Sequence, residues 1–368
     1  MFSLNDKVSI RQLQTLLIIE IFGAGVIILP RKAAQYAGQD AWVLITITTI
    51  LAVCSVYLMT GVGRLYPQSS FISIASNLLS KPVGRLIGVL FIAKLLFNCA
   101  IELRLFGEIL RQSMLPRTPF TVICAIMISI SAYAAAKGYE ARARLAQILF
   151  PLLFIPFVFV FFLGLFEVDL TNLMPVFTAR PDNILLGSVR VGTAFTGLEL
   201  LLLVTPFAVR PLSVRKGMIQ AVIFVGALMI FVTTVTIAKF GPLEVTRQLW
   251  PVLEMMDFID LPGSFIERQD ALFMSFWIIS IFAIINASLF FSAILLRDVL
   301  EVGKHWFYIV LCMPIVLAGA YIMPSVVQVD YLMDIVFFTV GIGFMIVIPA
   351  ILLIVATLRK VSDERGKS

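Results

Sequence analysis

Long runs of apolar residues dominate the sequence, and each is long enough to cross a lipid bilayer as a helix. A run of about 18 or more apolar residues with few charges is typical of a membrane-spanning helix. The chain has 368 residues, of which 60% are hydrophobic and 14% charged, whereas a soluble domain carries about 25% charged residues. We therefore predict an all-α integral membrane protein forming a single polytopic membrane domain over residues 1–368. About ten transmembrane helices are expected, at roughly 12–37, 41–63, 85–111, 119–137, 144–166, 184–208, 217–239, 270–296, 306–324 and 333–358.

The basic residues predict the orientation of the chain rather than a nucleic-acid partner. The formal net charge is +6, but the lysines and arginines lie mostly between the apolar runs and form no single patch. If the N-terminus is cytoplasmic, the inner links carry roughly twice as many basic residues as the outer links, as the positive-inside rule requires. We therefore expect a multi-pass protein of the cell membrane with both termini in the cytoplasm, surrounded by lipid and binding no nucleic acid.

Two of the predicted spans are interrupted near their centres. Span one contains Gly23, Ala24 and Gly25, and span six contains Gly192 and Gly197. Glycine is the poorest helix former after proline, and unwound backbone inside a membrane is tolerated only where it is buried in protein or lines a cavity. Spans one and six are equivalent positions in two five-helix halves. This layout predicts an inverted-repeat transporter fold, with repeats at about 12–166 and 184–358 and a binding site at the midplane.

The glycines of span one also have a second interpretation. Small residues often serve only to let membrane helices approach one another closely. The matching break in span six favours the unwound interpretation, but the residues of span one alone do not separate the two.

Several charged or polar residues lie at membrane depth, where ionisable groups are costly and suggest function. Lys94, Asn98 and Glu102 recur every four residues and so share one helix face. They either line a polar interior or make structural bonds between helices. Glu20 precedes the first break by one turn and Glu199 follows the second directly. Each has three open roles: organising the unwound segment, moving a proton, or satisfying freed backbone donors.

The residues that would support catalysis or metal binding are missing from the pattern. The chain has one histidine, His305, and its four cysteines lie in apolar runs without a CxxC pair. There is no Ser-His-Asp set and no phosphate-binding loop. We therefore expect no metal, no cofactor and no enzymatic activity.

Two short motifs carry a resemblance to a known family. Residues 22–30, FGAGVIILP, resemble the first-helix motif of the amino acid–polyamine–organocation transporter superfamily, and residues 194–199, AFTGLE, resemble its sixth-helix motif. The resemblance is closer to the B subunit of spore germinant receptors. It is carried by residues 10–14 (IRQLQ), 37–42 (AGQDAW) and 265–268 (FIER), the last of which leads to Trp277.

The resemblance implies a LeuT-like fold of 5+5 inverted repeats with broken helices 1 and 6. It also implies a sensor in the spore inner membrane that binds a small nutrient, an amino acid or a sugar, and triggers germination with an A subunit and a C lipoprotein. The runner-up is a proton-coupled amino acid permease. By the superfamily pattern Gly23, Ala24 and Gly25 contact the ligand carboxylate, and Phe195, Thr196 and Gly197 form the unwound sixth helix, with Phe195 as an aromatic gate. Glu199 and Asn98 complete the expected ligand site. Glu20, Lys94 and Glu102 are candidates for coupling or gating.

Overall fold

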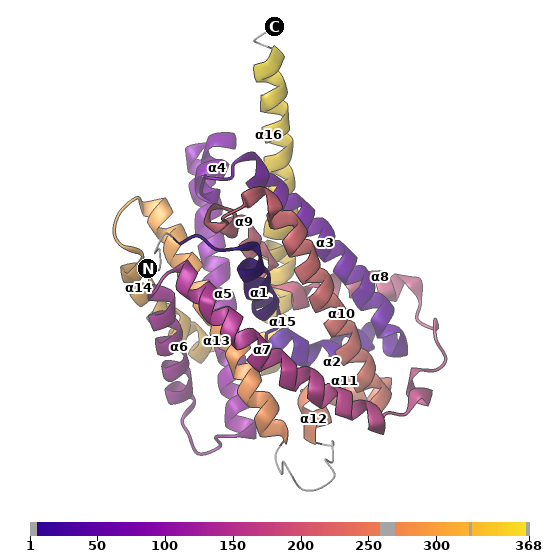
Figure 1. Cartoon of the computed structure of the whole chain (residues 1–368). Coiled ribbons are helices and arrows are strands. Elements are labelled where there is room, and N and C mark those ends of the chain that lie inside the picture. Colours follow the sequence, from indigo (N-terminus) through magenta and orange to yellow (C-terminus); the bar gives the residue numbers. More distant parts are fainter. Residues whose placement is uncertain (1–5, 258–268, 324–325, 366–368) are drawn as a thin grey trace.

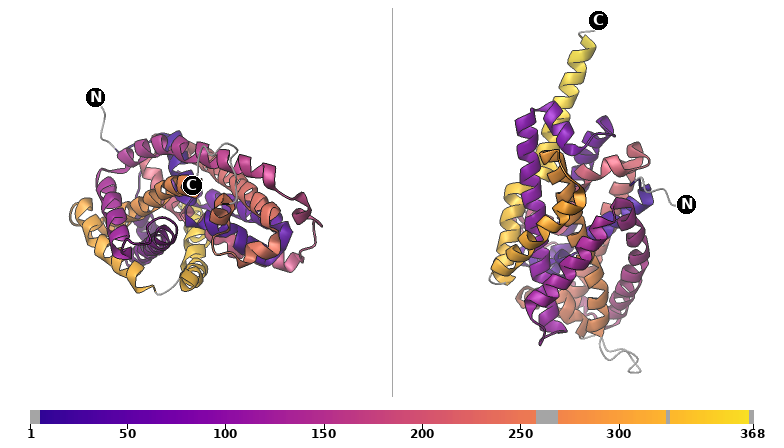
Figure 2. Two further views of the ribbon diagram at one scale, coloured as in Figure 1. Left: turned by 90° about the horizontal axis from the view of Figure 1, so that it is seen from below. Right: turned by 90° about the vertical axis from the view of Figure 1, so that its left-hand side faces the viewer.

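The computed structural model describes residues 6–257, 269–323 and 326–365. The motif at 265–268 lies outside the described residues. Apart from one β-bridge between Val8 and Ala208, the described chain is made of helices and their connections. The helices lie side by side in one bundle, and the C-terminal helix extends beyond it (Figures 1 and 2).

In the described part of the chain the first half contains seven α-helices, and the α-helices of the second half vary widely in length, from 4 residues in α9 to 32 in α13. The helices of the first half are α1 (Ile10–Ile21), α2 (Ala24–Ala37), α3 (Ala41–Leu65), α4 (Phe71–Leu78), α5 (Lys81–Ser113), α6 (Phe120–Ala136) and α7 (Tyr139–Gly164). Those of the second half are α8 (Pro181–Arg190), α9 (Leu201–Val204), α10 (Val214–Phe240), α11 (Pro242–Arg247), α12 (Pro251–Asp257), α13 (Gln269–Leu300), α14 (His305–Ile322), α15 (Val326–Val336) and α16 (Ile348–Arg365).

Each of the ten predicted segments is helical. By length and composition, seven helices of the described chain could cross a membrane, or eight if one bent pair counts as a span. The run Gly25–Leu65 counts as one span in that total, although it covers α3 and nearly all of α2. Helix α6 is not counted because it has 17 residues, one fewer than the 18 required of a span. The lower number, compared with the ten predicted spans, therefore comes from how α2 and α3 are counted and from the length threshold that excludes α6.

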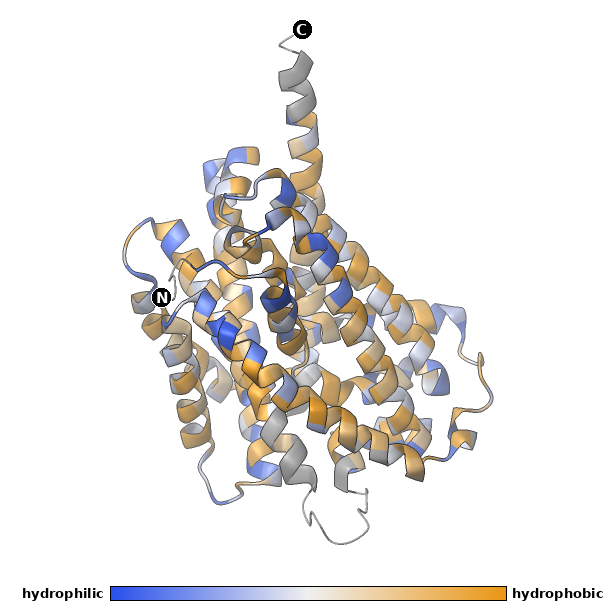
Figure 3. Ribbon diagram, viewed as in Figure 1, coloured by the Kyte–Doolittle hydropathy of each residue, from blue (hydrophilic) through white to orange (hydrophobic). Residues whose placement is uncertain are grey.

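The outer surface of the bundle is apolar. Ile50, Tyr133, Ile155 and Val310, from four different helices, each expose more than half of their side-chain surface, and hydrophobic residues cover the length of most helices (Figure 3). A soluble monomer rarely exposes contiguous apolar patches of this extent. The surface is that of a multi-pass membrane protein whose solvent is lipid.

The first predicted span is broken where its glycines stand. Helix α1 ends at Ile21, and α2 starts at Ala24 after Phe22 and Gly23. Phe22 anchors the break, because its ring packs against Phe154 and Phe157 of α7 at 5.1 and 4.7 Å between centroids. The predicted interruption of span one is confirmed.

The sixth predicted span is broken as well. Residues Val191–Phe195 continue α8 as a 3-10 helix, and a second one, Leu198–Leu200, leads into α9. The two halves of the span, Pro181–Phe195 and Leu198–Phe207, are bent by 60°. Gly197 adopts φ of +104°, a conformation that residues with a side chain rarely take. The position of this interruption also follows the prediction.

Helix α15 continues into a third irregular segment, which the sequence did not predict. Two π-helical stretches, Phe337–Gly341 and Gly343–Val347, join α15 to α16. Wide turns of this kind occur often at functional sites. The segment lies in the last predicted span, which reads as a continuous apolar run.

Candidate functional site

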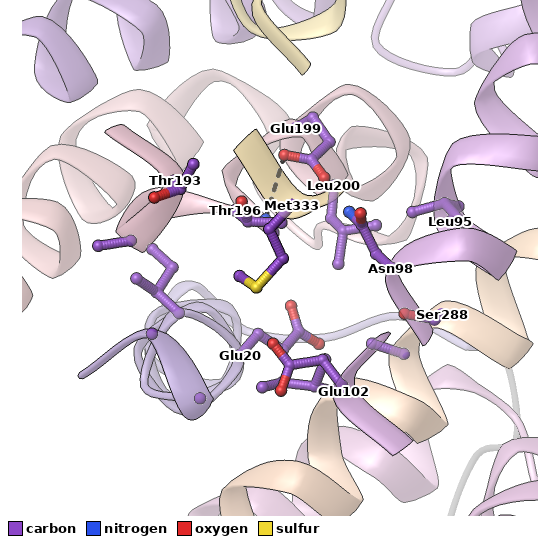
Figure 4. Close-up of a pocket in the computed structure, with 17 residues that line it drawn as sticks. Glu20, Leu95, Asn98, Glu102, Thr193, Thr196, Glu199, Leu200, Ser288 and Met333 are labelled. Atoms are coloured by element: carbon purple, nitrogen blue, oxygen red, sulfur yellow. Dashed lines mark hydrogen bonds between the residues drawn. The ribbon is translucent and has the colours of Figure 1, made fainter. Parts of the chain in front are cut away.

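A small cavity of about 30 Å³ lies between the two broken helices. Its walls come from both breaks, from α5 and α13, and from one residue of α15 (Figure 4). The lining residues are Glu20, Ile21, Gly23, Gly25, Leu95, Asn98, Glu102, Thr193, Ala194, Thr196, Gly197, Glu199, Leu200, Ile284, Ala287, Ser288 and Met333. The unwound backbone thus borders a cavity in the protein interior. This agrees with the rule that non-helical backbone at membrane depth must be buried in protein or line a cavity.

The two breaks contact each other through small residues. A Cβ atom added to Gly25 would lie 3.4 Å from the Cα atom of Ala194, and one added to Gly197 would lie 3.5 Å from the carbonyl oxygen of Glu20. Gly25 therefore serves close packing and borders the cavity at once. The glycines of span one therefore fit both interpretations, close helix packing and an unwound segment beside a cavity.

Glu199 forms a buried ion pair with Lys94. The ammonium group of Lys94 donates to Oε1 of Glu199, and their side chains are only 2% and 1% exposed. The other carboxylate oxygen, Oε2, accepts the backbone N–H of Gly197 at 3.1 Å. Glu199 thereby stabilises the left-handed turn at Gly197 through one oxygen and pairs with α5 through the other. Of the three roles left open by the sequence, this is the organisation of the unwound segment.

Glu20 forms a second buried ion pair, with Arg142 near the start of α7. Nη2 of Arg142 donates to Oε1 of Glu20 at 2.7 Å. The guanidinium also lies 5.4 to 5.6 Å from the ring centroids of Tyr139, Phe290 and Phe291, a distance at which cations and aromatic rings attract each other. Arg142 lies between the predicted spans at 119–137 and 144–166, so the sequence did not indicate this partner.

The predicted polar face of α5 is present. Lys94, Asn98 and Glu102 together line a second cavity of about 20 Å³ that adjoins the first. The carboxylate oxygens of Glu102 would lie 3.5 and 3.6 Å from a Cβ atom on Gly23, so this acid stands beside the first break. A ligand carboxylate bound at Gly23 would meet a like charge there, and an ammonium group would meet an opposite one.

Phe195 is placed differently from the other predicted ligand residues. Its side chain is 1% exposed and does not line the cavity, whereas Gly23, Gly25, Thr196 and Gly197 do. Ala24 is the first residue of α2, and its side chain lies outside the part of the chain that the structure describes. The direct role of these two residues stays a prediction.

Other lining residues carried no signal in the sequence. Ile284, Ala287 and Met333 stand within apolar runs where nothing marks them as special. Ser288 of α13 also lines the cavity. Only three-dimensional packing selects these positions.

Comparison of the fold with solved structures gives a match over nearly the whole chain. The crystal structure of MhsT in complex with L-phenylalanine superposes with a TM-score of 0.65 at 12% sequence identity, over 94% of this chain and 97% of MhsT. At this identity the match concerns the fold, which is the LeuT-like fold of 5+5 inverted repeats with broken helices 1 and 6.

Comparison of the sequence identifies relatives among spore proteins of Bacillus subtilis (strain 168). Spore germination protein YndE is 28% identical over 77% of this chain and 78% of its own length. Spore germination proteins B2 and KB are 25% and 28% identical over 74% and 73% of this chain, and over 74% and 72% of their own lengths. The sequence profile described as spore germination protein matches residues 7–329. The chain therefore belongs to the spore germination protein family.

Proposed function

We propose that this chain is the B subunit of a nutrient germinant receptor and that it binds a small nutrient in the cavity between its two broken helices. The observation that carries the proposal is the cavity itself: backbone of both breaks and three carboxylates, Glu20, Glu102 and Glu199, border one interior space. A bound molecule touches both halves of the fold, so it can favour one arrangement of them over another. Sensing requires no more than such a difference in affinity.

The chemistry of the lining suits an amino acid or a sugar. Asn98, Thr193, Thr196 and Ser288 offer amide and hydroxyl groups for hydrogen bonds. The N-terminus of α2 presents backbone N–H groups and the positive end of a helix dipole. Glu102 adds a negative charge that would attract an amino group.

The proposed receptor works in the spore inner membrane with an A subunit and a C lipoprotein. Both termini are proposed to lie in the cytoplasm, because the basic residues favour that orientation. The chain acts as a sensor and not as an enzyme, and it needs no cofactor. Membership of the germination family and the large apolar surface support this placement.

Deletion of the gene in a spore-forming host tests the proposal. We expect spores to lose dipicolinate release in response to some amino acids or sugars and to keep it for others, with full recovery when the wild-type gene is restored. Normal release to every nutrient in a strain without other receptors of this family would contradict the receptor role.

A pocket variant then tests the site. Asn98→Leu keeps the approximate size of the side chain but removes its hydrogen-bonding groups, so it should raise the nutrient concentration for half-maximal release. Phe97→Leu, one residue earlier and outside the lining of the described cavities, is the matched control. An unchanged dose response for Asn98→Leu at normal protein level would show that the cavity is not the ligand site.

A proton-coupled amino acid permease is the second candidate, favoured by the permease-like family and the LeuT-like fold. A permease works alone, whereas a receptor subunit depends on its partners. Uptake of a radiolabelled amino acid by vesicles that contain only this chain, driven by a proton gradient, would favour the permease. Loss of germination without such uptake would favour the receptor.

A further inference from the structure

One side chain, that of Met333, borders three separate cavities. The central cavity of about 30 Å³, the adjoining cavity of about 20 Å³ and a third of about 10 Å³ all count Met333 among their lining residues. Among the residues that the structure describes, the second and third cavities share no other lining residue. In Figure 4 the thioether projects into the middle of the labelled polar residues. Met333 therefore stands as a partition inside one larger space.

The walls on either side of this partition carry polar groups. Lys94 and Asn98 line the second cavity, and Lys32 and Thr193 line the third. Met333 thus inserts an apolar, unbranched side chain between groups suited to bind polar ligands. Methionine has three rotatable side-chain bonds and adapts its shape more easily than other apolar residues. A change of its rotamer would therefore alter the boundary between the cavities.

The backbone around Met333 is also the least regular part of the cavity wall outside the two breaks. Residues Phe337–Gly341, which begin one helical turn later, form a π-helical stretch. Phe337 of this stretch lines the second cavity together with Met333. Such wide turns are frequent at functional sites.

We infer that Met333 is a specificity-determining residue that sets the upper size of the ligand. With the side chain in the observed position, the central cavity of about 30 Å³ has room for about two water molecules. This is less space than even glycine needs, so the cavity wall must move to admit any amino acid. A larger ligand requires Met333 to move into one of the neighbouring cavities. The inference rests on the proposed function, because it concerns the ligand of the same site.

Variants of Met333 with a graded series of amino acids test this inference. Met333→Ala should lower the concentration of L-valine, L-leucine or L-phenylalanine for half-maximal dipicolinate release, relative to glycine and L-alanine, by about tenfold or more. That is the scale on which pockets discriminate ligands that differ by a methylene group. Met333→Leu, which keeps the volume of the side chain, should change the preference less. Leu332→Ala, on the same helix but outside the lining of the three cavities, should leave it unchanged.

Binding to the purified protein separates this inference from the receptor role. The thermal stability of the wild type and of Met333→Ala is measured in lipid nanodiscs with each of the five amino acids. A shift of the stabilised series toward larger amino acids supports the inference, even if the gene proves dispensable for germination and the receptor role fails. An identical series for both proteins, or no stabilisation of either by any of the five, would overturn it.

Discussion

Breaking the ion pair between Lys94 and Glu199 should be among the most destabilising changes in this chain. Both side chains are almost fully buried, and besides Lys94 the carboxylate accepts the Gly197 N–H. Lys94→Met removes the opposite charge and leaves a carboxylate in a medium that solvates it poorly. Removing one partner of a buried ion pair costs about 3–5 kcal/mol, so we expect a loss of unfolding free energy of that order.

A double-mutant cycle measures how much of this loss belongs to the pair. Glu199→Gln combined with Lys94→Met removes both charges, and the double variant should be less destabilised than the sum of the single variants. Residues in direct contact show interaction energies of about 0.5–3 kcal/mol, and we expect the upper end of this range. The assay is titration of the purified protein with SDS in mixed micelles, with recovery of the folded state on dilution as the check of reversibility.

The exposed pair Arg85–Glu301 provides the matched control. Its nitrogen and oxygen are 2.9 Å apart, but the two side chains are 53% and 71% exposed. Exposed pairs contribute about 0.2–1 kcal/mol, so the cycle with Arg85→Met and Glu301→Gln should give a small interaction energy. If the Lys94–Glu199 cycle is additive within about 0.5 kcal/mol, or if Lys94→Met costs no more than Arg85→Met, the reasoning is wrong.

Three further changes test the local geometry. Gly25→Ala should keep a nearly normal dose response, because its Cβ atom would make an ordinary contact with Ala194. Gly25→Val should raise the nutrient concentration for half-maximal dipicolinate release. Equal dose responses of the two variants at equal protein levels would contradict this. Gly197→Ala should cost about 1–2 kcal/mol in SDS titration because of its left-handed backbone, whereas Gly343→Ala, where a Cβ atom meets open space, should not. Asp40→Asn should cost about 1–3 kcal/mol, since both carboxylate oxygens accept backbone N–H groups of residues 177–179 at 2.6 to 2.8 Å; a thermal stability equal to that of the wild type would contradict this role.

The broken helices were predictable because their cause is local. Glycine weakens a helix wherever it stands, so Gly23 and Gly197 mark the breaks without knowledge of the fold. The shared face of Lys94, Asn98 and Glu102 was predictable for the same reason, because it depends only on the period of the helix. Both signals come from residues that lie close together in the sequence.

The partners of the buried acids were not predictable in the same way. Arg142 lies 122 residues from Glu20 in the sequence, and the predicted start of span five at 144 excluded it, although α7 begins at Tyr139. An error of a few residues at a helix end thus moved a buried cation into a loop. Met333 was missed for another reason, since an apolar residue in an apolar run looks the same whether it faces lipid, the core or a cavity.

The two ion pairs tie each broken helix to a continuous one. Lys94 of α5 holds the acid beside the second break, and Arg142 of α7 holds the acid before the first. The charges of Glu20 and Glu199 are thereby balanced within the protein, and a ligand does not have to neutralise them. What a ligand gains on binding must then come from the cavity between the breaks, where the carboxylate of Glu102 stands beside Gly23. A ligand that fills this cavity binds one arrangement of the two breaks better than others, and that difference is the free energy available for signalling to partner subunits.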